Sequence, residues 1–144
     1  MRILGLDLGT KTLGVSVSDN TEIIATGLTT LRFEENKPED VINDLEEIIE
    51  EYNVKKIVIG LPKNMDNTLG FAADRTFEFI KVLKENFNIE IVTQDERLSS
   101  VTANNVLLNA DLSRKKRKEK VDKLAATIIL QNYLDIRKGI KNGK

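Results

Sequence analysis

Runs of apolar residues separated by short turns occupy the first part of the chain. Residues 2–8 and 12–18 are two such runs, joined by the tight turn Gly9-Thr10-Lys11. A connection this short between two strand-like runs predicts an antiparallel hairpin. Residues 22–31 predict a third strand, in which Gly27 indicates a β-bulge.

The spacing of apolar residues then changes from that of strands to that of helices. Pro38-Glu39-Asp40 carries the proline and the acids that favour a first helical turn. The apolar positions that follow have the i, i+4, i+7, i+8 spacing of a one-sided helix: Val41, Leu45, Ile48 and Ile49. The short apolar run 56–60 predicts a buried parallel strand that ends at Leu61-Pro62.

Helix and strand continue to alternate in the second half of the chain. After a polar loop at 63–70, a helix is expected with an apolar face made of Phe77, Ile80, Leu83 or Lys84, and Phe87. The remaining predicted elements are a fifth strand at 88–93, a helix from Ser99 or Ser100 to about Asn109, a basic loop, and a last helix from about Val121 to Arg137.

This order of elements predicts an α/β domain. Three adjacent antiparallel strands precede two helix–strand units and two further helices, which indicates a five-stranded mixed sheet flanked by helices. The length of 144 residues suits one domain with a sizeable core. We place that domain at residues 1–138, with 139–144 as a frayed tail.

Composition narrows the chemistry that the chain can perform. It contains no histidine and no cysteine, which excludes Ser-His-Asp and Cys-His mechanisms, disulfides, and zinc sites built from Cys and His. Acid–base or metal chemistry must therefore rest on Asp, Glu, Lys or Tyr. The absence of a long apolar run or signal-peptide pattern leads us to expect a cytoplasmic protein.

Asp7 is the most informative single residue. It is a lone carboxylate inside an apolar, strand-like run. Burying a charged side chain costs several kcal/mol unless cations or hydrogen bonds compensate it. Holding a divalent metal is the commonest reason for such a placement, and an ionised turn residue beside Gly9 is the alternative.

Two further acidic positions are suitably placed for the same site. Asp95-Glu96 follows a predicted parallel strand, at the end where α/β sheets bind ligands. Asp122 lies at the expected start of the last helix and shares a face with Ala125 and Ala126, whose small size would allow close approach to the sheet. Taken alone, Asp122 fits an acid that offsets the helix dipole, and Asp95-Glu96 fits a solvated turn. Together with Asp7 they indicate a site for Mg²⁺ or Mn²⁺, which prefer oxygen ligands.

Four ordered motifs carry a resemblance to a known family. They are Gly5-Leu-Asp-Leu-Gly-Thr-Lys-Thr-Leu-Gly-Val15, Gly60-Leu-Pro-Lys-Asn-Met-Asp66, Asp95-Glu-Arg-Leu-Ser-Ser100 and Val121-Asp-Lys-Leu-Ala-Ala-Thr-Ile-Ile-Leu-Gln131. Over nearly its whole length the chain resembles the YqgF/RuvX family of Holliday junction resolvases and pre-16S rRNA nucleases. The resemblance implies a ribonuclease H-like fold and assigns metal-site carboxylates to Asp7, to Glu96 with Asp95 as its competitor, and to Asp122. The number of metals stays open.

Charge is unevenly distributed although the net charge is only −1. Seven of the ten residues 114–123 are basic, whereas residues 34–51 are predominantly acidic. A local patch that binds the phosphate backbone is therefore more plausible than a uniformly basic surface, with a solvated loop as the alternative. The candidate nucleic-acid contacts are Lys11, Arg97, Arg114, Lys115, Lys116, Arg117, Lys118 and Lys120.

Three functions compete at this point. The leading hypothesis is a metal-dependent endonuclease that processes the 5′ end of pre-16S rRNA, and the alternative activity is resolution of four-way DNA junctions. Asp7-Leu-Gly-Thr10 also fits the phosphate loop of sugar kinase and actin-like ATPases, but that class needs two such domains and a much longer chain. A non-catalytic nucleic-acid-binding module on a nuclease fold is the third. A monomer or weak homodimer is expected, since symmetric cutting of a junction requires two copies.

Overall fold

The computed structural model describes residues 1–35, 37–62, 70–95 and 114–141. Most of the loop expected at 63–70 and the helix expected from Ser99 or Ser100 to Asn109 lie outside these residues. Within the described part of the chain, no helix is long and apolar enough to cross a membrane.

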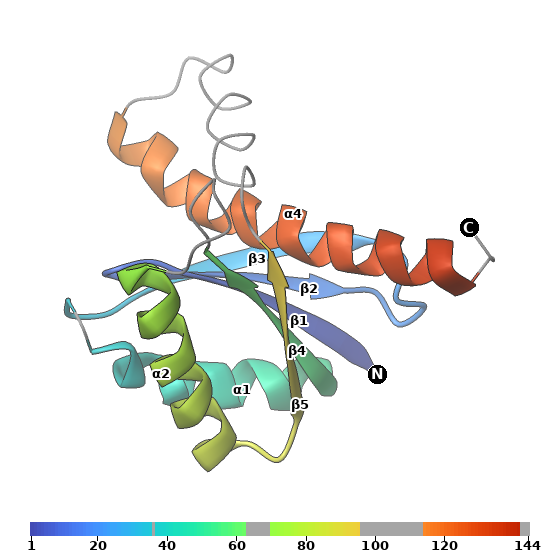
Figure 1. The fold of residues 1–144 in the computed structure, drawn as a ribbon, viewed down its shortest axis with the longest axis horizontal. Coiled ribbons are helices and arrows are strands. Elements are labelled where there is room, and N and C mark those ends of the chain that lie inside the picture. Colours follow the sequence, from blue (N-terminus) through green and yellow to red (C-terminus); the bar gives the residue numbers. More distant parts are fainter. Residues whose placement is uncertain (36, 63–69, 96–113, 142–144) are drawn as a thin grey trace.

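A single five-stranded sheet organises the molecule (Figure 1). Its strands are β1 (Arg2–Leu8), β2 (Thr12–Ser18), β3 (Ala25–Arg32), β4 (Val54–Leu61) and β5 (Glu90–Asp95), and their order across the sheet is β3-β2-β1-β4-β5. The first three strands are antiparallel, whereas β4 is parallel to β1 and β5 is parallel to β4. The mixed sheet predicted from the sequence is confirmed, and β1 lies at its centre.

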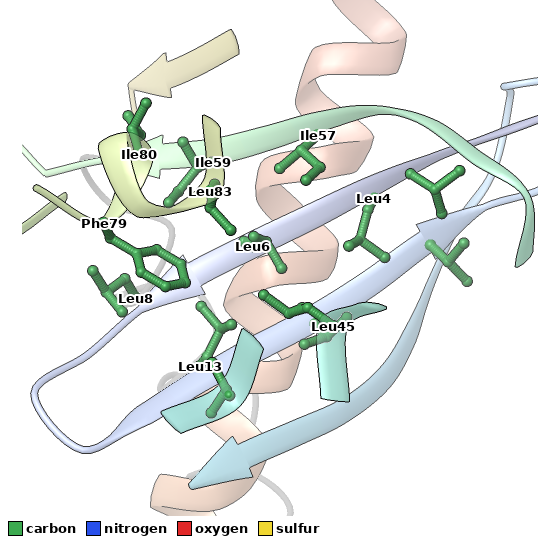
Figure 2. Close-up of a cluster of buried hydrophobic side chains, with 14 residues drawn as sticks. Leu4, Leu6, Leu8, Leu13, Leu45, Ile57, Ile59, Phe79, Ile80 and Leu83 are labelled. Carbon is green, nitrogen blue, oxygen red and sulfur yellow. The ribbon is translucent and has the colours of Figure 1, made fainter. Parts of the chain in front are cut away.

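Two layers of helices cover the two faces of this sheet (Figure 1). One face carries α1 (Ile42–Tyr52) and α2 (Phe71–Asn86), and the other carries α4 (Arg114–Lys141). Since side chains alternate along a strand, each buried strand contributes to both layers. The larger apolar core lies under α1 and α2 (Figure 2) and includes Leu4, Leu6, Leu13, Leu45, Ile57, Ile59, Phe79 and Leu83. The smaller core under α4 consists of Ile3, Val58, Ile129, Leu130 and Leu134.

The first helical segment begins differently from the prediction. Residues Pro38–Val41 form a 3₁₀ turn, and the α-helix starts only at Ile42. Val41 and Leu45 are fully buried, as their spacing predicted. Asn53 ends α1 in the left-handed conformation (φ 52°), which asparagine tolerates better than most residues.

The buried face of α2 corrects one prediction. Phe77 is 40% exposed, whereas Phe79 is fully buried against the sheet. Two residues along a helix differ by about 200°, so both phenylalanines cannot face the core. The buried side of α2 contains Phe79 together with Ala73, Thr76 and Leu83. Near the helix start it therefore buries the small residues Ala73 and Thr76 in place of the predicted Phe77.

The last helix is longer than predicted. It starts at Arg114 instead of Val121, so the segment expected to be a basic loop has a helical backbone. Lysine and arginine are good helix formers, which makes this extension compatible with the sequence. Asp122 therefore lies two turns inside the helix and cannot serve as an N-terminal acid that offsets the dipole. The helix also continues to Lys141, past the expected domain end at Lys138.

The third strand begins at Ala25, three residues later than expected, and contains the predicted bulge. Val15 pairs with Thr29 while the next residue, Ser16, pairs with Gly27, which leaves one residue of β3 unmatched. Before the strand, the carboxylate of Asp19 organises the connection between β2 and β3. It accepts hydrogen bonds from the Thr21 hydroxyl and from the N–H groups of Ile23 (2.9 Å) and Ile24 (3.1 Å).

These hydrogen bonds, first that of Thr21, lower the pKa of Asp19 to about 2. Because the folded pKa is below the ordinary value of 3.8, the stabilisation is complete above about pH 4 and is lost as the pH falls through about 2. We expect Thr21→Val to raise the pKa of Asp19 toward its ordinary value, measured by ¹³C NMR titration of the carboxyl carbon. Thr26→Val, the same change at an exposed position of β3, should leave it unaltered. An identical titration in both variants would contradict this role of Thr21.

Candidate nuclease site

Asp7 lies near the carboxyl end of the central strand β1, opposite Gly14 of β2. Its side chain is only 7% exposed. Alternation along β1 places Asp7 on the same face as Ile3, which packs under α4. The sequence-based prediction of a buried carboxylate in the middle of the sheet is therefore confirmed, and Asp7 lies on the face of the sheet that carries α4.

The helix α4 approaches the sheet very closely two residues before Asp7. A Cβ atom on Gly5 would lie 2.4 Å from Ser16 Oγ, 2.7 Å from Leu130 Cβ and 3.0 Å from the carbonyl oxygen of Ala126. The first two distances are too short for any side chain, so only glycine fits beneath the helix. The buried Ser16 hydroxyl donates a hydrogen bond of 2.8 Å to the Ala126 carbonyl. Ala125 and Ala126 are fully buried, as their small size predicted.

The direction of α4 over the sheet follows from the contacts. Ile3 belongs to the cluster that contains Leu130 and Leu134, whereas Gly5, farther along β1, lies against Ala126. Moving along β1 toward Asp7 thus means moving to lower residue numbers in α4. Position 122 is one helical turn before Ala126 in this helix. The side chain of Asp122 lies outside the described part of the structure.

The register of β5 distinguishes the two neighbouring acids Asp95 and Glu96. Val58 pairs with Val92, and both belong to the core under α4. Counting on by alternation, Gln94 shares that face, whereas Asp95, paired with Leu61, faces the α1 and α2 side. Asp95 and Asp7 therefore point to opposite faces of the sheet. Glu96 lies outside the described residues, and among those described no three acidic side chains form a cluster.

The candidate nucleic-acid contacts occupy two regions of the described chain. Lys11 is exposed in the turn between β1 and β2, a turn closed by a hydrogen bond of 2.8 Å from Gly9 N–H to the Thr12 carbonyl. Arg114–Lys120 forms the first two turns of α4, before position 122. Arg97 lies outside the described residues. The turn and the helix start are thus both connected to elements that carry candidate metal ligands.

Polar contacts hold the second half of α4 against the sheet, and none of them was foreseen from the sequence. The side chain of Gln131 accepts a hydrogen bond from Ala25 N–H and donates one to the Ile23 carbonyl, both 2.9 Å long. Such a glutamine resembles any exposed polar residue in a sequence. Its role becomes visible only when β3 and α4 are placed side by side.

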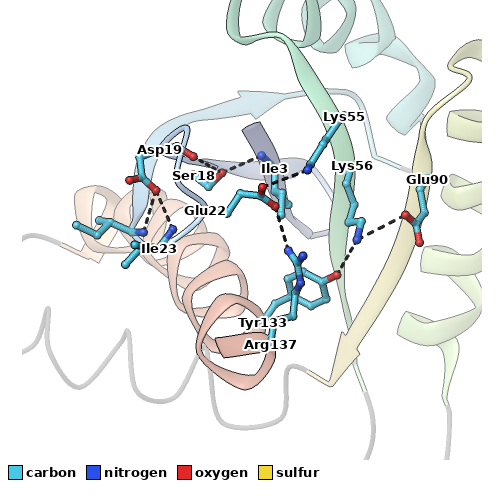
Figure 3. A network of polar contacts seen from close by, with 11 residues as sticks. Ile3, Ser18, Asp19, Glu22, Ile23, Lys55, Lys56, Glu90, Tyr133 and Arg137 are labelled. Carbon is cyan, nitrogen blue, oxygen red and sulfur yellow. Dashed lines mark hydrogen bonds and ion pairs between the residues drawn. The ribbon is translucent and has the colours of Figure 1, made fainter. Parts of the chain in front are cut away.

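Glu22 and Lys56 extend this network (Figure 3). The Glu22 carboxylate pairs with Lys55 of β4 and Arg137 of α4, each at 3.1 Å. Burial raises the pKa of Glu22, but the hydrogen bonds from Lys55 and Arg137 outweigh it and the pKa is lowered. Lys56 donates a hydrogen bond of 3.1 Å to the Tyr133 hydroxyl. The end of α4 is thereby fixed to the loop before β3 and to β4.

Comparison with known proteins places the chain in a family. The model of the family described as RuvX: Holliday junction resolvase matches residues 1–136. A protein of Clostridium acetobutylicum named "Putative pre-16S rRNA nuclease" is 54% identical over 135 residues, which cover 94% of this chain and 98% of that protein. A protein of the same name from Geobacillus sp. (strain WCH70) is 50% identical over the same shares. The chain belongs to the RuvX family, as its motifs indicated.

Solved structures support the fold. RuvC of T. thermophilus in complex with a Holliday junction substrate superposes with a TM-score of 0.57 at 16% identity, covering 96% of each chain. The fowlpox virus resolvase in complex with Holliday junction DNA gives a TM-score of 0.55 at 15% identity, covering 95% of this chain and 99% of that one. At such low identity the likeness concerns the fold alone, which is the ribonuclease H-like fold predicted from the sequence.

Proposed function

We propose that this member of the RuvX family is a metal-dependent endonuclease that hydrolyses phosphodiester bonds in precursor 16S ribosomal RNA. The observation that carries the proposal is Asp7, a buried carboxylate on the central strand beneath α4. Burying a carboxylate is costly unless it is compensated, and a bound cation offsets that cost. The relatives with about half of their residues identical carry the nuclease name, which supports the same activity here.

The residues present fit a hard divalent cation. The chain lacks histidine and cysteine, so every candidate ligand is an oxygen donor, as Mg²⁺ and Mn²⁺ require. We assign the site to Asp7, Glu96 and Asp122. A cation bound there would supply Lewis-acid stabilisation of the phosphate and activation of water. Asp7 would hold it from the sheet, and the overlying α4 would limit the access of solvent to the carboxylate.

Strand alternation favours Glu96 over Asp95 as the second ligand. Asp95 lies on the face opposite Asp7, and the next residue of an extended strand would return to the face of Asp7. The helical repeat likewise favours Asp122, because position 122 is four residues before Ala126, which touches the sheet. The three carboxylates would then converge from β1, from the end of β5 and from α4.

The basic start of α4 would bind the substrate backbone. In a helix, positions 115, 118 and 122 follow i, i+3, i+7 spacing and share a face, whereas 116 and 120 lie on the other side. We therefore assign backbone contacts to Lys115 and Lys118 first. They would guide a strand toward the metal site without reading its sequence.

Junction resolution is the second candidate, because the family model is described as a Holliday junction resolvase. It requires two copies that cut two strands symmetrically. The number of protein chains bound to one four-way DNA junction separates the two functions. Two chains and paired cuts would favour resolution, whereas a monomer that cuts precursor RNA would favour ribosomal RNA processing.

Asp7→Asn should lower cleavage of precursor ribosomal RNA by about two orders of magnitude or more, because it removes a charge that acts on the transition state. Binding of the RNA should persist or tighten, since one repulsive charge is lost. Asp44→Asn, the same change at an exposed position of α1, serves as the control. Rates are measured with purified proteins in Mg²⁺ and in Mn²⁺. Equal cleavage by Asp7→Asn and wild type would exclude the mechanism and favour a non-catalytic binding module.

Glu96→Gln should reduce cleavage about as much as Asp7→Asn, whereas Asp95→Asn should retain most of the activity. The reason is that Asp95 faces away from Asp7, whereas one further residue in an extended conformation would return to the face of Asp7. Combining Glu96→Gln with Asp7→Asn should add little, as for groups that act as one unit. Single-turnover rates at saturating Mg²⁺ provide the measurement. A greater loss in Asp95→Asn than in Glu96→Gln would reverse the assignment.

Replacing Lys115 and Lys118 by Gln should make the slope of log K against log salt shallower by roughly 0.7–0.9 for each lost phosphate contact. Lys116→Gln with Lys120→Gln removes the same charge from the other side of the helix and should change the slope less. Filter binding to single-stranded RNA and duplex DNA between low and moderate salt tests both pairs. Equal slopes in the two double variants would contradict the helical arrangement of the contacts.

A further inference from the structure

We propose that Ser16 is a positioning residue that fixes the height of α4 above the sheet and thereby sets the spacing of Asp7 and Asp122 for metal binding. This inference rests on the proposed nuclease function and identifies a residue outside the three assigned carboxylates. Ser16 lies on β2, and its hydroxyl bonds to the helix backbone and not to another side chain.

The contact between Ser16 and α4 is a short hydrogen bond that is completely buried. Ser16 is completely buried, and its Oγ lies 2.8 Å from the Ala126 carbonyl oxygen. That carbonyl also accepts the N–H of residue 130 within the helix, so the serine uses its second lone pair. The same Oγ lies 3.4 Å from the Gly5 carbonyl of β1. One hydroxyl thus connects the central strand, its neighbour and the helix at one level.

The contact between Gly5 and Ala126 lies one repeat of the backbone from the candidate metal ligands, two residues along β1 and four residues along α4. Asp7 is two residues beyond Gly5 on β1, a distance of roughly 6–7 Å along the strand. Asp122 is four residues before Ala126, a rise of about 6 Å along the helix. Because Gly5 and Ala126 touch, similar steps from that contact lead to both acids. A small change in the distance between α4 and the sheet at Ser16 would therefore change the distance between Asp7 and Asp122.

The absence of a side chain on Gly5 is the second half of this arrangement. With Leu130 Cβ only 2.7 Å from where a Gly5 Cβ would lie, any larger residue would push α4 away from the sheet. The hydrogen bond from Ser16 holds α4 against the sheet, and the missing side chain of Gly5 leaves room for this close approach. Neither contact involves a carboxylate, so both act on the metal through backbone position.

Ser18 provides a matched control on the same strand. It is also buried and faces the same side of the sheet, but its hydroxyl accepts a hydrogen bond from the Ile3 N–H (2.8 Å) and donates one to the Asp19 carbonyl (3.0 Å), and neither partner belongs to α4. Ser18→Ala leaves a buried N–H without its partner, whereas Ser16→Ala leaves the Ala126 carbonyl with its helical bond. Ser18→Ala should therefore destabilise the fold at least as much.

The experiment compares Mn²⁺ binding by wild type, Ser16→Ala and Ser18→Ala, using electron paramagnetic resonance of free Mn²⁺ at a temperature where all three are folded. Melting temperatures in EDTA measure the purely structural effect. We expect Ser16→Ala to weaken Mn²⁺ binding on the order of ten-fold, as for residues that orient metal ligands. Ser18→Ala should bind Mn²⁺ like wild type despite an equal or larger loss of melting temperature. Gly5→Ala, which keeps the hydroxyl but lifts the helix, should weaken Mn²⁺ binding as well.

Two results would overturn the inference, and they have different meanings. Equal Mn²⁺ affinity in Ser16→Ala and Ser18→Ala, with binding still lost in Asp7→Asn, would show that Ser16 has only a structural role and would leave the nuclease proposal intact. Equal Mn²⁺ binding by Asp7→Asn and wild type would remove the metal site itself and both proposals with it.

Discussion

The close packing of α4 on the sheet at Gly5, Ser16 and Ala126 is the contact on which the proposed metal site depends. A helix usually lies about 10 Å from a sheet because side chains of ordinary size separate them. Here a glycine and a serine face an alanine, and the helix backbone itself accepts a hydrogen bond from the sheet. Asp7, which is buried, lies two residues farther along β1 on this same face of the sheet.

The two faces of the sheet have different tasks. The face under α1 and α2 carries large aliphatic and aromatic residues, and their burial supplies most of the favourable free energy. The face under α4 has a smaller apolar core and includes the buried polar residues Asp7, Ser16 and Ser18. Polar burial is costly, so the larger core on one face stabilises a fold that buries the Asp7 carboxylate on the other.

Acidic and basic residues are also distributed differently between the helices on the two faces of the sheet. The exposed side of α1 carries acids such as Glu46, Glu47 and Glu50, and this helix covers the face opposite α4. Seven of the ten residues 114–123, in the first part of α4, are basic. The near-zero net charge therefore combines an acidic helix α1 with a basic first part of α4. Phosphate groups are attracted by basic residues and repelled by acidic ones, so this distribution would favour nucleic acid near α4 over α1.

The sequence by itself determined the existence of the five strands, their order along the chain and the special position of Asp7. Continuous apolar runs and short turns are local signals, and a carboxylate inside such a run stands out without any knowledge of its neighbours. The bulge at Gly27 and the small residues Ala125 and Ala126 were also predictable, because each leaves a mark in the residue type itself.

Only the tertiary structure decided the features that depend on a partner element. Which of Phe77 and Phe79 is buried depends on how α2 packs against the sheet. The helical backbone of residues 114–120 was not predicted, because so many consecutive charges are also typical of a solvated loop. The pairing of β4 with β5 shows that Asp7 and Asp95 lie on opposite faces of the sheet. Ser16 is one small polar residue among several in the sequence. It acquires a role because a helix carbonyl more than a hundred residues away lies 2.8 Å from its hydroxyl, a distance that no local pattern encodes.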